Sequence, residues 1–243
     1  MVCVDKPISS PNFNVRGHAV PGRWVSFFVL NTGGKSLEWF HSIFCRDMTE
    51  QRFYEQYIPE TLAWFFGSGE RDAIEEMLPL YSPFLGGSRY TMEQLKAAFA
   101  GVTLETTREP MLLSLLRGNA AYHGEYLHEV GSLVPLGREV TTTGGGAKIR
   151  GYNDVKRRWT GDFEYVYKDE SSLNGAAMLG QFYLAGGPQL PCRPGSLREL
   201  EGHRLQNGAG CKFATGSRLK SALFRTVRGA DAILALRCDH LNG

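Results

Sequence analysis

Three consecutive glycines, Gly144, Gly145 and Gly146, constrain this chain more than any other feature of its sequence. They follow the apolar and threonine-rich run 140–143, which predicts a strand, and they precede a segment that predicts the start of a helix. Without a Cβ, such residues let backbone N–H groups approach a phosphate or a flat ring, and a helix start adds unpaired donors and a positive dipole end. The pattern indicates a nucleotide site, although a tight turn with no ligand has the same sequence.

Residues beyond this turn supply further candidates for nucleotide binding. An amide at Asn153, one turn into the expected helix, matches the donor and acceptor edge of adenine. Asn174 is a candidate for the same pocket or for a helix cap before Gly175. Lys148 and Arg150 are interpreted either as cations that neutralise phosphate or as solvated residues of a helix start. The nucleotide-binding residues expected from the sequence are Gly144, Gly145, Gly146, Ala147, Asn153 and Asn174.

Apolar periodicity predicts alternating strands and helices around this turn. A helix begins at Ser36 and places Leu37, Phe40, Ile43 and Phe44 on its apolar face. Thr91 is expected to cap a short helix over 92–100, and Pro110 suits the first turn of a long helix that reaches about residue 130. The other predicted elements are a strand at 24–30, a helix over 50–65 broken near Pro59, a helix over 71–77 and a strand at 164–167.

Six motifs occur in the order found in one enzyme family. They occupy residues 18–24, 33–40, 80–87, 99–102, 144–146 and 175–177. Taken together, from about residue 18 to 184, they resemble the C-terminal half of the FGGY carbohydrate kinases, which phosphorylate sugars and have an actin-like ATPase fold. One departure is Arg117, at a position where family members usually carry an acidic residue.

The resemblance implies an α/β chain with an actin-like ATPase (ribonuclease H-like) C-terminal domain, a mixed sheet flanked by helices. It implies a nucleotide-binding domain over residues 1–185, with ATP and Mg²⁺ as cofactors. The family's sugar-binding domain carries the aspartate that acts as general base, and we expect this domain to be absent from the sequence. Phosphoryl transfer needs a group that orients or deprotonates the nucleophile, so we expect no catalytic residue here and no turnover by the chain alone.

Composition agrees with an ordinary globular chain. Of 243 residues, 42% are hydrophobic and 21% charged, which suits a packed core and one or two domains. No apolar run approaches the roughly 18 residues of a membrane span, and residues 1–10 lack a signal core. The five cysteines, at 3, 45, 192, 211 and 238, have no paired spacing typical of metal or redox motifs. We therefore expect free thiols, no protein metal site, no membrane partner and a cytoplasmic location.

Residues 186–243 differ in composition from the rest of the chain. They hold nine Lys and Arg against four Asp and Glu, whereas the remainder holds 18 against 21. A basic Gly/Arg-rich segment is able to bind nucleic acid through phosphates, but neither interleaved aromatic residues nor a known nucleic-acid module accompanies it. We therefore expect no nucleic-acid partner. We interpret 186–243 as an atypical, poorly ordered tail in which only 222–228 and 230–236 are apolar enough to fold.

Two functional hypotheses remain open at this stage. In the first, the chain is the ATP-binding half of a carbohydrate kinase and transfers the γ-phosphate to a sugar or polyol hydroxyl only with a sugar-binding half from another chain or the intact gene. In the second, it is a non-catalytic kinase remnant that acts as a binding module or has no function. An upstream reading frame for a sugar-binding half would discriminate the two. The sequence names neither the sugar nor the oligomeric state.

Overall fold

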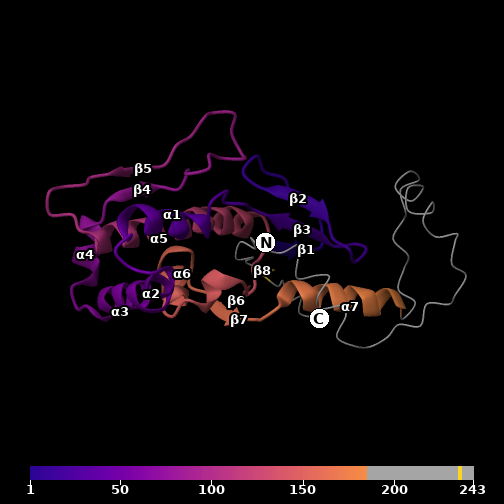
Figure 1. Ribbon diagram of the computed structural model, residues 1–243. Helices are drawn as coiled ribbons and strands as arrows, with labels where there is room; N and C mark the ends of the chain where they lie inside the picture. Colours follow the sequence, from indigo (N-terminus) through magenta and orange to yellow (C-terminus); the bar gives the residue numbers. More distant parts are fainter. Residues whose placement is uncertain (185–234, 237–243) are drawn as a thin grey trace, which may run out of the picture. The chain divides into compact units, whose positions relative to one another are not determined.

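The computed structural model describes residues 1–184 and 235–236 (Figure 1). The chain divides into two compact units, one made of residues 1–171 with 231–243 and the other of residues 172–230. The described part of the second unit is nearly all of helix α7 (Ser171–Leu184). Every other helix and strand of the described residues belongs to the first unit. The domain boundary expected at residue 185 stays a prediction.

The first unit contains a mixed sheet, as the sequence predicts. Its strand order is β2-β3-β1-β8-β6-β7. Strands β1 and β2 both pair antiparallel with β3, whereas β6 and β7 are parallel neighbours. Short β8 runs parallel to β1 and antiparallel to β6. The bounds are β1 (Val2–Val4), β2 (Asn14–Gly17), β3 (Trp24–Phe27), β6 (Glu139–Thr142), β7 (Glu164–Tyr167) and β8 (Ala235–Leu236).

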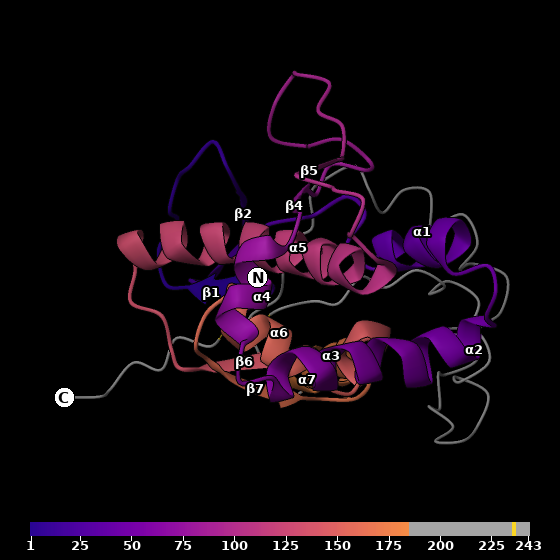
Figure 2. The ribbon, with the colours of Figure 1, turned by 90° about the vertical axis from the view of Figure 1, so that its left-hand side faces the viewer.

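The long helix α5 (Arg108–Leu133) connects two hydrophobic cores. Leu112 and Leu116, in its first half, pack into a core shared with other helices. Tyr126 and Val130, in its second half, pack with apolar residues of β1, β6 and β7. Figure 2 shows α5 on one side, with α3 (Ile58–Gly67) and α6 (Tyr152–Trp159) opposite it. These three helices contact one another, and the second half of α5 packs against the sheet.

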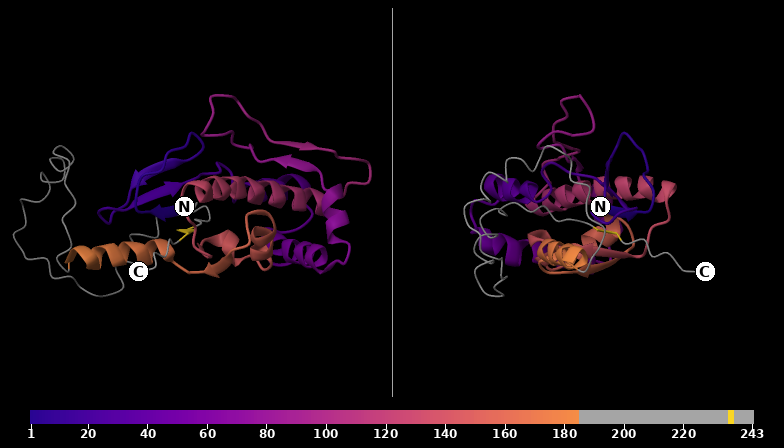
Figure 3. Two further views of the ribbon diagram at one scale, coloured as in Figure 1. Left: turned by 180° about the vertical axis from the view of Figure 1, so that it is seen from behind. Right: turned by 90° about the vertical axis from the view of Figure 1, so that its right-hand side faces the viewer.

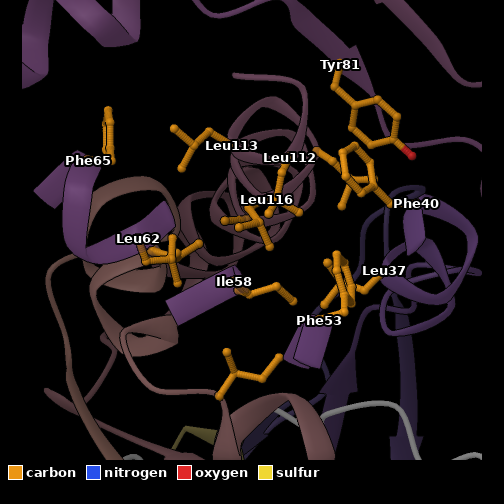
Figure 4. Packing of buried hydrophobic residues seen from close by; sticks show 14 of the residues in the cluster. Leu37, Phe40, Phe53, Ile58, Leu62, Phe65, Tyr81, Leu112, Leu113 and Leu116 are labelled. Atoms are coloured by element: carbon orange, nitrogen blue, oxygen red, sulfur yellow. The ribbon is translucent and has the colours of Figure 1, made fainter. Parts of the chain in front are cut away.

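The helical core buries the apolar face of α1 (Lys35–Phe44) against α3 and α5. In Figure 4 the labelled side chains of these three helices point toward one another. Phe40 is fully buried and Leu37 is nearly so, which confirms two positions of the predicted stripe. Ile43, in contrast, is 47% exposed, so its expected burial is wrong. A helix that packs on one side leaves part of a wide apolar stripe at the solvent boundary.

The predicted helix over 50–65 continues past its proline. It consists of α2 (Glu50–Arg52), a π-helical stretch over Phe53–Tyr57 and α3, which has Pro59 in its first turn. Proline has no N–H and its ring clashes with the carbonyl four residues earlier in a regular helix. The wider π turn, in which the Ile58 N–H donates to the Phe53 carbonyl, precedes the proline directly. The expected break is therefore a change of helix type. Helix α4 (Arg71–Met77) has the predicted bounds.

The predicted helix over 92–100 is wrong. Thr91 caps only a local turn, in which its hydroxyl accepts from the Glu93 N–H at 3.1 Å. Ala98–Ala100 instead forms strand β5, which pairs antiparallel with β4 (Leu80–Ser82). The rings of Tyr81 and Phe99 lie opposite each other with centroids 4.6 Å apart. Figure 3 shows this ribbon running along α5. A partner strand far along the chain has therefore overridden local helix propensity.

Arg117, the residue that departs from the kinase motif, supports the local structure. Its guanidinium donates to the carbonyl of Glu75 at 2.9 Å and lies near those of Leu78 and Pro79 at 3.5 and 3.4 Å. The Glu75 carbonyl lies in the last turn of α4 and the other two follow directly after it, where the helix dipole favours a cation. Arginine at this position thus joins α5 to the C-terminal end of α4.

Several expectations concern residues outside the described ranges. The predicted disorder of 186–243 lies there, except that Ala235–Leu236, within the apolar stretch 230–236, forms β8. Among the described cysteines, Cys3 and Cys45 are free thiols, as expected. Within residues 1–184 and 235–236, every helix is too short or too polar to cross a bilayer.

Candidate functional site

The triple glycine lies where strand β6 ends. Gly144 has φ 87° and ψ 178°, in the region that L side chains rarely adopt, and it turns the chain away from the strand. A 3₁₀ turn over Gly145–Lys148 follows, in which the Ala147 N–H donates to the Gly144 carbonyl at 3.2 Å. We call residues 144–148 the glycine turn. Its position after a strand that has a parallel neighbour matches the expected strand-to-turn transition.

The glycine turn is open to a ligand. No atom lies within 4 Å of the position that a Cβ on Gly145 would take, and Gly146 meets only the edge of the Tyr152 ring, at 4.0 Å. Within the described residues, the N–H groups of Gly145 and Gly146 have no hydrogen-bond acceptor. Two unpaired donors beside open space suit the oxygens of a phosphate. The turn therefore fits the nucleotide that the sequence predicts.

The helix after the glycines begins later than expected. The Ile149 N–H donates to the Gly146 carbonyl at 3.3 Å and ends the 3₁₀ turn, and α6 starts only at Tyr152. Between them, Gly151 has φ 84°, a left-handed conformation that interrupts a right-handed helix. Its missing Cβ also leaves room for Leu62, whose Cβ lies 3.3 Å from the vacant position. Asn153 is therefore the second residue of α6 and not one turn into the helix.

Asn153 keeps its polar group inside the protein. The residue is half-buried, and its Oδ1 atom is buried with no hydrogen-bond partner among the described residues. Buried polar side-chain atoms are usually paired, so an orphaned amide oxygen beside an open turn is a candidate ligand contact. Asn174 lies on α7, in the second unit. Its role in the same pocket stays a prediction.

Charged residues near the turn are mostly solvated. Lys148 is exposed and its ammonium lies 3.6 Å from a carboxylate oxygen of Asp169, and Arg150 is also exposed. The hydroxyl of Tyr167, which donates to Asp169 at 2.8 Å, and the Lys148 ammonium lower the pKa of that carboxyl group. For Lys148 and Arg150, the solvated alternative agrees with the structure.

The described residues hold no group of three or more His, Cys, Asp or Glu side chains able to bind a metal ion. Magnesium is often carried to such sites by the phosphates of a nucleotide with only one or two carboxylates. In this arrangement Mg²⁺ would arrive with the nucleotide.

A groove of about 450 Å³ lies at the opposite end of α6, between α5 and the start of β7. Leu127, Leu136 and Phe163 form its apolar lining, and His128 and Asp162 are among its polar residues. It does not include the glycine turn. We therefore base the candidate site on backbone geometry and orphaned polar groups.

The solved structures that resemble this chain include two sugar kinases. The crystal structure of xylulose kinase from Rhodospirillum rubrum matches with a TM-score of 0.60 and 16% sequence identity, over 77% of this chain and 36% of that one. A xyloylose kinase from Brucella ovis matches with a TM-score of 0.56 and 18% identity, over 76% of this chain and 37% of that one. The chain has the fold of part of a sugar kinase.

This kinase fold agrees with the actin-like ATPase class expected from the motifs. The chain spans little more than a third of either kinase's length, and at these identities the likeness concerns the fold alone. No protein-family model and no curated protein sequence matches the chain.

Two polar residues beside the glycine turn were missed by the sequence reasoning. Thr142, the last residue of β6, is 1% exposed and its hydroxyl has no partner among the described residues. Lys156, on α6, is 6% exposed and its ammonium is also without a hydrogen-bond partner there. Lys156 begins the basic run 156–158, which is typical of a solvated helix face, so the sequence carries no signal of its burial.

Proposed function

We propose that residues 1–185 form the nucleotide-binding, C-terminal domain of an FGGY-type carbohydrate kinase and bind ATP or ADP. One observation carries the proposal: an open glycine turn with two unpaired N–H groups stands between a strand and a helix, in a chain with the fold of part of a sugar kinase. A turn of this kind binds phosphate through backbone donors and requires no side chain at the contact.

Each candidate residue has a role in this proposal. The N–H groups of Gly145 and Gly146 hold phosphate oxygens, and Gly144 supplies the backbone conformation that presents them. Asn153 pairs with the edge of adenine, and Ala147 and Asn174 stay predicted contacts of the nucleotide. Magnesium, bound with the nucleotide, neutralises phosphate charge.

The 243 residues alone are not expected to phosphorylate a sugar. They match only 36% and 37% of the two xylulose-type kinases, and transfer to a hydroxyl requires a positioned acceptor and a group that orients it. A sugar-binding half would have to supply both. We propose that the sugar or polyol binds only when such a half is present.

Calorimetric titration of the purified chain with Mg·ATP and Mg·ADP tests the nucleotide site. Gly145→Asp should abolish detectable binding, because it places a carboxylate where phosphate oxygens would lie. Gly145→Ala is the matched control: the position has open space and no positive φ, so this variant should stay folded and lose much less affinity.

Equal binding by the wild type and by Gly145→Asp would contradict the proposed site. No binding by a folded wild type would contradict the proposed function and favour a non-catalytic remnant. A separate assay measures ATP consumption by the chain alone with a panel of pentoses, ketoses and polyols, and we expect none that depends on the sugar. Sugar-dependent turnover by the chain alone would show that a separate sugar-binding half is not needed.

A further inference from the structure

The inward face of α6 carries a charge that the described residues do not neutralise. Lys156 is 6% exposed, and its ammonium has neither a hydrogen-bond acceptor nor a carboxylate partner among them. It lies over two aromatic rings, 5.2 Å from the centre of the Tyr152 ring and 5.8 Å from that of Tyr165. Such contacts offset only part of the cost of removing a cation from water. Burial accordingly lowers the pKa of Lys156 to about 8.

Two other orphaned polar atoms face the same interior. Val140 lies beside Tyr165 in the parallel pairing of β6 and β7, so Thr142, two residues further along β6, points to the same face of the sheet as Tyr165. Asn153 and Lys156 are three residues apart on α6 and share a face of that helix. The Thr142 hydroxyl, the Asn153 side-chain oxygen and the Lys156 ammonium are all buried and without a described partner.

Tyr152 connects this interior to the glycine turn. Its Cε1 atom lies 4.0 Å from the position of a Cβ on Gly146, and the ammonium of Lys156 lies 5.2 Å from the centre of the same ring. The orphaned cation and the glycine turn therefore both lie near the same aromatic ring. The four-carbon stem of lysine is flexible enough to carry the ammonium around that ring.

The donors gathered here favour an anion. The ammonium and the unpaired N–H groups donate only, and the threonine hydroxyl donates as readily as it accepts. The amide of Asn153 presents either its oxygen or its nitrogen after rotation about the terminal bond. A neutral ligand would leave the buried cation uncompensated, whereas a phosphate oxygen would pair with it in a charge-assisted hydrogen bond.

We infer that Lys156 is the cationic residue of the phosphate site at the glycine turn, where its ammonium leaves the two tyrosine rings and binds a phosphate oxygen held by the Gly145 and Gly146 N–H groups. The inference rests on the proposed nucleotide function and adds to it the residue that matches the phosphate charge. The Thr142 hydroxyl supplies a neighbouring polar contact, and Asn153 keeps its proposed role toward adenine.

The variant Lys156→Met tests this role in the full chain. Calorimetry with Mg·ATP, and separately with sodium tripolyphosphate, should give affinities at least about tenfold weaker than wild type. The midpoint of thermal unfolding should not fall, because methionine fills similar space without a buried unpaired charge. Lys96→Met, which removes an exposed lysine, is the matched control and should bind both probes like the wild type.

A second measurement uses the unaltered protein. Nuclear magnetic resonance of the lysine side chains should report a pKa of Lys156 that rises when tripolyphosphate is added, since a nearby anion favours the charged form. An unchanged pKa at a saturating concentration of the probe would contradict the inference, even if Lys156→Met fails to fold.

The outcomes separate this inference from the proposed function. Tight Mg·ATP binding that Lys156→Met leaves intact overturns the inference alone, and the ammonium is then solvated by internal water. Tripolyphosphate binding that is lost in Lys156→Met supports the phosphate site. If the wild type then binds Mg·ATP no more tightly than tripolyphosphate, a nucleotide function is contradicted. Binding of neither probe by the folded wild type overturns both.

Discussion

Phe40→Ala is expected to destabilise the chain by about 3–5 kcal/mol. Phe40 is fully buried on α1, and its ring centroid lies 4.9 Å from that of Phe44 and 6.4 Å from that of Phe53. Figure 4 shows it directed into the interior that α1, α3 and α5 share. Its truncation removes apolar contacts and leaves a cavity that the surrounding helices fill only in part. This loss is a large fraction of the free energy of unfolding of a typical folded protein, which is roughly 5–15 kcal/mol.

Urea unfolding followed by circular dichroism measures this change, with Ile43→Ala as the control on the same helix. Ile43 lies on the stripe that the sequence assigns to the core, but it is 47% exposed. Its replacement should cost less than about 1 kcal/mol. Similar losses for both variants would mean that α1 does not pack as described.

Gly118→Ala should destabilise the chain by about 1–3 kcal/mol through overpacking, although alanine is the better helix former. A Cβ at Gly118 would lie 2.6 Å from the backbone oxygen of Tyr81 and 2.8 Å from its Cδ1 atom. Strand β4 lies against α5 at this point, and backbone cannot give way as a flexible side chain does. Thermal unfolding should therefore begin at a lower temperature in this variant.

Gly131→Ala, on the same helix, gives the matched comparison. Its nearest neighbour would be Cδ1 of Leu136 at 3.4 Å, the end of a side chain that can move. This variant should be neutral or more stable by up to about 1 kcal/mol. If both alanine variants stabilise the protein, the close approach of β4 to α5 is absent.

Local patterns predicted many of the elements correctly. Residues 71–77 and 164–167 have the predicted type and bounds, and the long helix beginning near Pro110 extends from Arg108 to Leu133. In these segments the apolar spacing, the turn residues and the final structure agree. The triple glycine likewise predicted a turn between a strand and a helix, because few other residues adopt the backbone of Gly144.

Contacts between distant segments explain the failures. Residues 92–100 were expected to be helical, but Ala98–Ala100 pairs with Leu80–Ser82. Helix α6 begins only at Tyr152, later than predicted, because Gly151 has a left-handed conformation and packs against Leu62. Neither event has a local signal that outweighs helix propensity.

The sequence by itself determined the glycine turn, the main helices and the likeness to sugar kinases, because spacing and backbone freedom are local properties of the chain. Only the tertiary structure decided which polar groups are enclosed beside that turn. Lys156 has the sequence context of a solvated lysine on a basic helix, yet α6 packs with this face inward, against Tyr165 of β7. Burial and the loss of partners depend on what covers a residue, and that is set by packing between segments far apart in the chain.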